Sequence, residues 1–361
     1  MLKKLQTFDE IYSEVESLSQ NNFDRAIPLG KLEVMSPKRL RHVNNKKIIN
    51  LTDYSQNQLL QKLNFSVTDY FRDTEQLQMD RLSYRLEQAN KREYVFRMTK
   101  NGSYSLRGVV TTQKYQKFDA LDILDSLHEE LGKSALNRLR FDSNIYDDDC
   151  PDDFRLSMML NEAQSVMKEL GRKFAFSCGL SLFTSEIGRL SLYLNQIFMR
   201  MACTNGIVVP DSSGVEKHRH VGGIIDWFKK KLHKVLNSSK ENFSEILSIY
   251  SNMENILIES LDDMKKTIIA SLCSFELPYT AHYQNVYKII EKSYPSFSLQ
   301  SLVNGLTDYT QRMPLSQRFK VERGVGEWLI NPNQYEKVLV EAKSTELSEV
   351  KELEDKKDAK K

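Results

Sequence analysis

Cysteine is scarce in this chain, with only 4 among 361 residues. The cysteines stand at positions 150, 178, 203 and 273, and none forms a Cys-x-x-Cys pair. This spacing argues against a disulfide framework, because small stapled proteins carry dense and regularly spaced cysteines. We therefore expect reduced, mostly buried thiols in a cytoplasmic protein.

Long apolar runs are also missing. The N-terminus has no continuous apolar segment of the signal-peptide kind, and no run approaches the roughly 20 residues that cross a bilayer. We expect no membrane partner, and residence in the cytoplasm. An excess of one charge is missing as well: the formal net charge is +2. A polyanionic partner must therefore be inferred from local charge.

The common chemical motifs are absent. The sequence contains no Gly-x-x-x-x-Gly-Lys-Ser/Thr loop, no Gly-x-Gly-x-x-Gly turn, no His-Glu-x-x-His and no Gly-x-Ser-x-Gly. We assign no catalytic residue, metal or cofactor, and the sequence leaves open whether the protein is an enzyme.

What the chain does contain is a pattern typical of an α+β protein, with an antiparallel hairpin packed on helices. Residues 93–99 and 103–112 alternate around Asn101-Gly102, which favours a type I′ turn. Phe118 and Asp119 then begin a helix that Asp119 caps. Further strands are expected over 174–183 and 207–209, whereas residues 190–201 fit a strand or a helix.

Four regions are expected along the chain. Residues 1–90 are mostly helical after Asp53, with an acid-free basic stretch over 38–47 that is typical of a solvated loop. An α+β core domain follows over 91–230, and a helical region over 231–330 that contains one long amphipathic helix between Phe243 and Ile268. A charged tail over 331–361 is expected to be disordered.

Several short segments together resemble a known family. They are Gln58-Leu59-Leu60-Gln61-Lys62-Leu63, Tyr70-Phe71, Phe96-Arg97, Leu106-Arg107-Gly108-Val109-Val110, Tyr115, Phe118-Asp119, Ser185-Glu186-Ile187-Gly188, Arg200-Met201-Ala202-Cys203-Thr204-Asn205-Gly206 and His218-Arg219-His220-Val221-Gly222. In this order they resemble the phage/plasmid-like protein family, a domain of unknown function numbered nine-three-two. The similarity covers roughly residues 28–225. It implies a viral or plasmid setting and names no reaction; if the protein is viral, the cytoplasm in which we expect it is that of the host.

Two segments could hold a metal ion. His218 and His220 would project to one side of a strand and, with Cys203, offer three zinc ligands. Lys217 and Arg219 oppose a cation there, and no fourth ligand is evident. The acidic segment 142–153 could hold a hard cation, but it lacks the glycine of a calcium loop and is more typical of a solvated linker.

Two basic segments interleaved with aromatic residues, over 81–107 and 217–234, favour nucleic-acid binding. If Phe96 and Met98 face the core, strand alternation predicts that Arg97 and Arg107 face outward. The predicted nucleic-acid contacts comprise Arg92, Arg97, Lys100, Arg107, Lys114, Lys217, His218, Arg219, His220, Lys229 and Lys230.

We therefore expect a single-stranded-DNA-binding protein that forms homo-oligomers and promotes ATP-independent strand annealing in recombination or replication. The outline is similar to Rad-fifty-two-like annealing proteins, an analogy of topology only. A metal-dependent nuclease or nucleotide-processing enzyme remains an alternative, as does a structural or regulatory protein that binds other proteins through its long helix.

Overall fold

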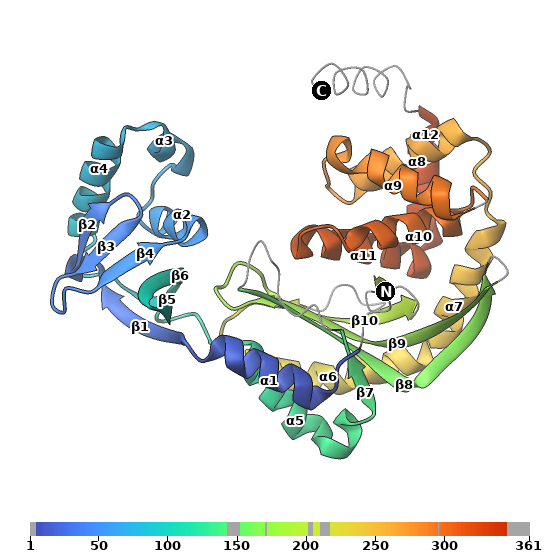
Figure 1. The fold of residues 1–361 in the computed structure, drawn as a ribbon, viewed down its shortest axis with the longest axis horizontal. Coiled ribbons are helices and arrows are strands. Elements are labelled where there is room, and N and C mark those ends of the chain that lie inside the picture. Colours follow the sequence, from blue (N-terminus) through green and yellow to red (C-terminus); the bar gives the residue numbers. More distant parts are fainter. Residues whose placement is uncertain are drawn as a thin grey trace.

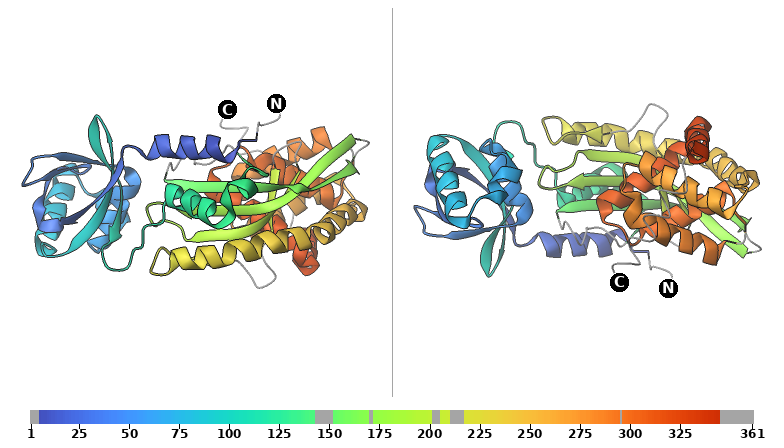
Figure 2. Two further views of the ribbon diagram at one scale, coloured as in Figure 1. Left: turned by 90° about the horizontal axis from the view of Figure 1, so that it is seen from below. Right: turned by 90° about the horizontal axis from the view of Figure 1, so that it is seen from above.

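The computed structural model describes residues 5–142, 152–169, 172–200, 205–209, 217–294 and 296–344. It is a mixed α+β fold, as the sequence predicts, with two β-sheets that belong to two lobes (Figure 1). Residues 22–111 form the N-terminal lobe. Residues 8–19 and the described residues between 118 and 344 form the main lobe. Figure 2 shows the two lobes side by side along the long axis, with the chain crossing between them before residue 22 and after residue 111.

The N-terminal lobe is a curled six-stranded sheet with helices packed against it. The strand order is β1-β5-β6-β4-β3-β2, and β4 and β6 run parallel. The strands are β1 (Asn22–Pro28), β2 (Leu32–Ser36), β3 (Arg39–His42), β4 (Ile48–Leu51), β5 (Glu93–Asn101) and β6 (Ser103–Thr111). The helices are η1 (Leu29–Lys31), α2 (Asp53–Lys62), α3 (Val67–Arg72) and α4 (Glu75–Gln88).

The predicted hairpin is confirmed as β5 and β6, but its turn differs from the expected type I′. That turn needs positive φ at two residues, and here only Gly102 has it, at 76°, while Asn101 pairs directly with Ser103. The hairpin pairs with β1 on one side and β4 on the other. The predicted boundary at residue 90 therefore falls inside the N-terminal lobe.

The first region of the chain is helical after Asp53, as expected, in α2, α3 and α4, but residues 22–51 contain the strands β1, β2, β3 and β4, which were not expected. The basic stretch 38–47 includes β3, which pairs with β2 and β4. Leu40 in its centre is fully buried, which accounts for the strand where a solvated loop was expected. The charge of this stretch does not reveal that it pairs with β2 and β4, which are separate segments of the chain.

The main lobe is built on an antiparallel sheet in the order β11-β10-β9-β8-β7, with β12 beside β10. Its strands are β7 (Leu139–Phe141), β8 (Asp153–Glu169), β9 (Arg172–Ser185), β10 (Leu192–Arg200), β11 (Asn205–Val209) and β12 (Lys217–His218). The strand expected over 174–183 is confirmed, and the ambiguous segment 190–201 contains a strand. Helices cover both faces of this sheet (Figure 1).

Helices α1 (Phe8–Ser19), α5 (Ala120–Leu136) and α6 (Ile224–Glu241) lie on one face. Asp119 caps α5 as predicted, in a reciprocal capping box with Asp122. The helical region expected after residue 230 is confirmed. It continues through α7 (Phe243–Asn252), η2 (Met253–Asn255), α8 (Leu261–Ser274), α9 (Tyr279–Ser293), α10 (Leu299–Thr310), α11 (Leu315–Ile330) and α12 (Pro332–Ser344). No helix in these described ranges combines the length and apolarity needed to cross a bilayer.

The single long helix expected between Phe243 and Ile268 is wrong, because α7 and α8 are separate. Between them, the N–H of Ile258 donates to the Phe297 carbonyl at 2.8 Å, and residue 256 accepts from Leu299. This extended pairing interrupts the helix. Phe243 and Ile268 are both buried in the core of the main lobe, whereas Leu257 and Leu261, between α7 and α8 and at the start of α8, are exposed.

Order also extends into the expected tail. Helix α12 covers residues 332–344 and buries Val338 and Ala342, which contradicts the expectation of disorder from residue 331. Residues 345–361 lie outside the described part of the chain.

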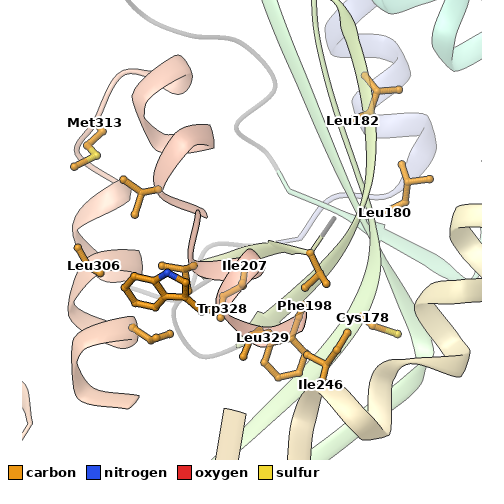
Figure 3. Packing of buried hydrophobic residues seen from close by; sticks show 14 of the residues in the cluster. Cys178, Leu180, Leu182, Phe198, Ile207, Ile246, Leu306, Met313, Trp328 and Leu329 are labelled. Carbon is orange, nitrogen blue, oxygen red and sulfur yellow. The ribbon is translucent and has the colours of Figure 1, made fainter. Parts of the chain in front are cut away.

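The core of the main lobe joins its sheet to the C-terminal helices. Figure 3 shows Phe198 of β10 beside Ile246 of α7, with Trp328 and Leu329 of α11 close by. Cys178 is a free, buried thiol within this core, and burial raises its pKa to about 12. It is therefore inert, as expected of a structural thiol. Cys273 is free but exposed, and Cys150 and Cys203 lie outside the described residues.

Candidate binding sites

Arg97 of β5 lies between the two lobes. Its side chain is only 2% exposed and forms ion pairs with Asp119, at the start of α5, and with Asp24 of β1 at 3.0 Å. It also donates to the Tyr115 hydroxyl at 2.9 Å and to the backbone carbonyl of Glu186. A guanidinium with this many acceptors is a structural tie between the lobes.

Arg107 of β6 forms the second tie. It pairs with Asp152, just before β8, and with the carboxylate of Glu186 after β9. Burial and Asp119 raise the pKa of Glu186, while Arg107 and Arg97 act in the opposite direction. Arg97 and Arg107, both in the N-terminal lobe, therefore stabilise the contact between the lobes by pairing with acids of the main lobe.

The prediction that Arg97 and Arg107 face outward is wrong. Strand alternation does turn Arg97 away from Phe96 and Met98, which lie in the core of the N-terminal lobe. The opposite face, however, is covered by the main lobe at this point, so Arg97 and Arg107 are buried and paired.

Three of the segments that carry the family resemblance, over 58–63, 106–110 and 185–188, meet at this contact. The Gln58 side chain accepts from the Val109 N–H at 2.7 Å and donates to the Ile187 carbonyl at 3.1 Å. A Cβ on Gly108 would lie 2.7 Å from Cβ of Ile187, so only glycine permits this approach.

A cavity of about 150 Å³ opens at the same contact. Residues from both lobes line it, including Gln58, Lys62, Lys114, Tyr115, Gly188 and His220. The His220 ring stacks on Tyr115 with centroids 5.5 Å apart, and its Nε2 lies 2.7 Å from Thr184 Oγ1. Its Nδ1 is fully buried, and a hydrogen bond between the ring and the Gln116 backbone acts to raise the pKa of His220. Burial lowers the pKa of His220 to about 4, so the ring is neutral near pH 7.

His218 lies in a different environment from His220. Its Nδ1 is 2.6 Å from the Arg219 carbonyl, and its ring packs on Trp227 with centroids 5.4 Å apart. Cys203, the third proposed zinc ligand, lies outside the described residues. Within the described ranges, no three His, Cys, Asp or Glu side chains are grouped as metal ligands.

The described ends of the acidic segment do not form a solvated linker. Asp152 pairs with Arg107, as described above, and Asp153 is fully buried against Arg189. Asp142 lies 3.8 Å from Arg318 of α11, which also pairs with Glu322 of the same helix at 2.7 Å in a second buried cluster of charges. Buried carboxylates need such partners. Residues 143–151 lie outside the described part.

The remaining predicted contacts are spread over the surface. Lys229 pairs with Glu129 at 2.6 Å and Glu130 at 3.4 Å, on α5. The other predicted cations that are exposed are Arg92, Lys100, Lys114, Lys217, Arg219 and Lys230. The structure therefore does not gather the predicted residues into one surface.

A basic and aromatic surface does form at one end of the N-terminal lobe. Tyr104, at the start of β6, packs edge-on against Phe23 of β1 with ring centroids 5.9 Å apart. Lys47, from the loop before β4, lies 4.6 Å from the Tyr104 ring centroid and donates to its hydroxyl at 2.7 Å. Arg25 and His42 share a small depression with these three residues. We call these five residues, together with Lys46 and Lys100, the basic end.

Positive charge dominates the basic end. The hydrogen bond from Lys47 lowers the pKa of Tyr104 against a smaller effect of burial, and the charges of Lys100 and Arg25 lower it further. Burial lowers the pKa of His42, with further lowering by Arg25 and Lys31. Asp24, the acid next to Arg25 in sequence, is engaged by Arg97.

Sequence reasoning found only part of this surface. It selected Lys100 and included Tyr104 in the basic and aromatic segment 81–107, but it treated the stretch 38–47 as a solvated loop and selected no residue from it, nor Phe23 or Arg25. The usable signal was that stretch, which contributes Lys46 and Lys47.

Comparison with known proteins adds no relative. No protein-family profile, no curated protein and no solved structure matches the chain.

Proposed function

We propose that this protein binds single-stranded DNA through the basic end of its N-terminal lobe. The main observation behind the proposal is that two segments distant in sequence contribute a lysine and an aromatic ring to the same surface. Lys47 comes from the basic stretch 38–47 and Tyr104 from the hairpin, and Phe23 packs against the same ring.

The chemistry of this surface suits an unpaired strand. Lysine and arginine side chains attract phosphates by charge, and binding releases counterions. Aromatic faces accept unstacked bases of any sequence. The Tyr104 side chain is partly exposed, as is Phe23, so both rings are accessible while remaining anchored in the sheet. Binding of this kind is insensitive to sequence and sensitive to salt.

Strand annealing and self-association are further parts of the proposal. One basic end covers a short length of strand, so several subunits would be needed to hold a long one, with a gain in avidity. The phage or plasmid setting that the sequence resemblance implies is part of the same proposal.

A binding experiment with a matched control tests the proposal. Fluorescence anisotropy of a labelled forty-base DNA strand should show binding at low salt that weakens as salt rises. The double variant Lys47→Ala/Tyr104→Ala should bind roughly 5- to 150-fold more weakly, since one stacked base contributes about 1–3 kcal/mol. The matched control is Lys265→Ala/Tyr287→Ala, which removes a lysine lying 5.3 Å from a tyrosine ring centroid on α8 and α9.

The salt dependence supplies a second measurement. Lys100→Ala should lower the slope of log affinity against log salt by about one unit, because one phosphate contact is lost. Wild-type protein that leaves the strand unbound at micromolar concentration and low salt would refute the proposal. Equal losses in the Lys47/Tyr104 and Lys265/Tyr287 variants would refute the assignment to the basic end.

A further inference from the structure

Helix α6 carries three lysines and a tryptophan along one flank. These residues stand at positions i, i+3, i+4 and i+7 of the helix, and they are Trp227, Lys230, Lys231 and Lys234. Lys230 and Lys234 are exposed, and Trp227 and Lys231 are partly exposed. The acids of α6 are its third and its last residue. The flank between them is therefore positively charged.

This flank faces away from α5. On the other side of α6, Lys229 pairs with Glu129 and Glu130 of α5. Trp227 stands two positions before Lys229, which is about 200° around the helix, so the two side chains leave α6 on opposite sides. A third side of α6, which includes Phe228, is buried in the core of the main lobe. The lysine flank therefore lies at the outer edge of the layer that α1, α5 and α6 form (Figure 2).

His218 adds a second ring to this flank. It belongs to β12, which pairs with β10, and its ring centroid lies 5.4 Å from that of Trp227. Its neighbours Lys217 and Arg219 are exposed. We define the α6 surface as His218, Trp227, Lys230, Lys231 and Lys234. It combines cations with partly exposed rings, as the basic end does.

Single-stranded DNA fits the α6 surface better than a membrane or a duplex. A helix that binds a membrane inserts its apolar face among the lipids, but the apolar face of α6 is buried in the main lobe. A duplex keeps its bases stacked on one another, whereas an unpaired strand offers bases to aromatic faces and phosphates to lysines. From Trp227 to Lys234 the flank is about 10 Å long, so it offers both kinds of contact along a short segment of strand.

The α6 surface and the basic end lie on opposite sides of the molecule. Figure 2 shows α1 and α6 along the two long sides of the main lobe, with α5 between them. The basic end is on the α1 side. Phe23 follows soon after Ser19, the last residue of α1, and the N–H of Lys100 donates to the Asn21 carbonyl at 3.0 Å. A strand bound at one surface therefore leaves the other accessible.

We propose that the α6 surface binds a second segment of single-stranded DNA, so that one chain holds two strands at once. The choice of ligand rests on the proposed function, whereas the site and its residues do not. Holding two strands on one chain also suits annealing, which has to bring two strands together. Glu129 and Glu130 lie across α6 from the lysine flank and oppose an anion, so this surface should bind more weakly than the basic end.

Tryptophan fluorescence of the full-length protein tests the site. Trp227 belongs to the α6 surface, whereas Trp328 is only 2% exposed. An eight-base DNA strand should quench the fluorescence in a saturable manner as a base stacks on Trp227, and Trp227→Phe should abolish this quenching.

Removal of the lysines supplies the second measurement. In Lys230→Ala/Lys231→Ala/Lys234→Ala, the midpoint of quenching at low salt should rise at least about tenfold, and the slope of log affinity against log salt should fall by about two units, at roughly 0.7 for each phosphate contact. The matched control is Lys266→Ala/Lys288→Ala/Lys292→Ala, which removes the same charge from α8 and α9 and should leave the midpoint unchanged.

The Lys47→Ala/Tyr104→Ala variant separates this site from the basic end, because it should keep the quenching of Trp227 with an unchanged midpoint. Titration calorimetry should find two eight-base strands bound per wild-type chain, and one in either the Lys47/Tyr104 or the Lys230/Lys231/Lys234 variant. If the assignment to the basic end fails while Trp227 is still quenched, the second site stands.

The inference is overturned by fluorescence that submillimolar strand leaves unchanged, by quenching that survives in Trp227→Phe, or by equal shifts of the midpoint in the two triple-lysine variants. One strand per wild-type chain would also overturn it. A change in Trp227 fluorescence with phosphatidylserine vesicles, and none with DNA, would assign the surface to a membrane in place of a strand.

Discussion

Replacing Arg97 by methionine tests whether this buried arginine stabilises the contact between the two lobes. Methionine keeps much of the length of the side chain but removes its charge and all its donors. Asp119 and Asp24 would lose an ion-pair partner, and the Glu186 carbonyl would lose a hydrogen bond. Breaking a buried pair by removing one partner costs about 3–5 kcal/mol.

The lower end of that range applies here. Asp119 keeps Lys117 at 3.6 Å, and the Asp24 side chain is 29% exposed, so water can hydrate it. We expect a loss of about 3 kcal/mol in the free energy of unfolding. The m-value in urea is about 1–3 kcal/mol/M for small proteins and increases with chain length, so the urea midpoint should fall by up to about 1 M.

Urea unfolding followed by circular dichroism and by tryptophan fluorescence measures this effect. Both tryptophans, Trp227 and Trp328, lie in the main lobe, so fluorescence reports that lobe, whereas circular dichroism reports both. The matched control is Arg92→Met, an exposed arginine next to the same strand, which should change stability by no more than about 0.5 kcal/mol. A midpoint for Arg97→Met equal to that of the control would refute a structural role.

Three further outcomes follow from the geometry. The pKa of His220 is about 4 in the folded protein and roughly 6.5 in an unfolded chain. Between these values the unfolded state binds more protons, so the free energy of unfolding should fall as the pH is lowered. In urea titrations, lowering the pH from 7 to 5 should reduce the free energy of unfolding by about 2 kcal/mol less in His220→Gln than in the wild type. Gly326→Ala would place a Cβ 1.9 Å from the Val208 carbonyl oxygen and should destabilise by about 1–3 kcal/mol in thermal unfolding, whereas Gly222→Ala, with open space around it, should not. Elemental analysis of purified protein should find no stoichiometric zinc, because His218 and His220 face different surroundings.

Short-range signals in the sequence predicted much of the local structure. Alternation and Asn101-Gly102 located the hairpin, and Asp119 with Asp122 located the start of α5. These features depend on residues within a few positions of one another, so the information is contained in the segment itself. The same reasoning failed between Phe243 and Ile268, because the pairing that interrupts the helix comes from residues 297–299.

The candidate sites depended on contacts that no short segment specifies. Alternation told us that Arg97 lies on the face opposite Phe96, and this is correct. It could not tell us what covers each face, because the partners Asp24, Asp119 and Glu186 lie between 22 and 89 residues away. One face of the strand meets its own core and the other meets the second lobe.

The basic end likewise combines features that the sequence determined with contacts that depend on the tertiary structure. The sequence alone determined that basic and aromatic residues occur together in two segments, and it predicted a strand that would carry Tyr104. Only the tertiary structure decided that Lys47, 57 positions away, lies against that ring. The physical reason is that β4 pairs with β6, and the register of a parallel pair distant in sequence is set by the packing of the whole sheet.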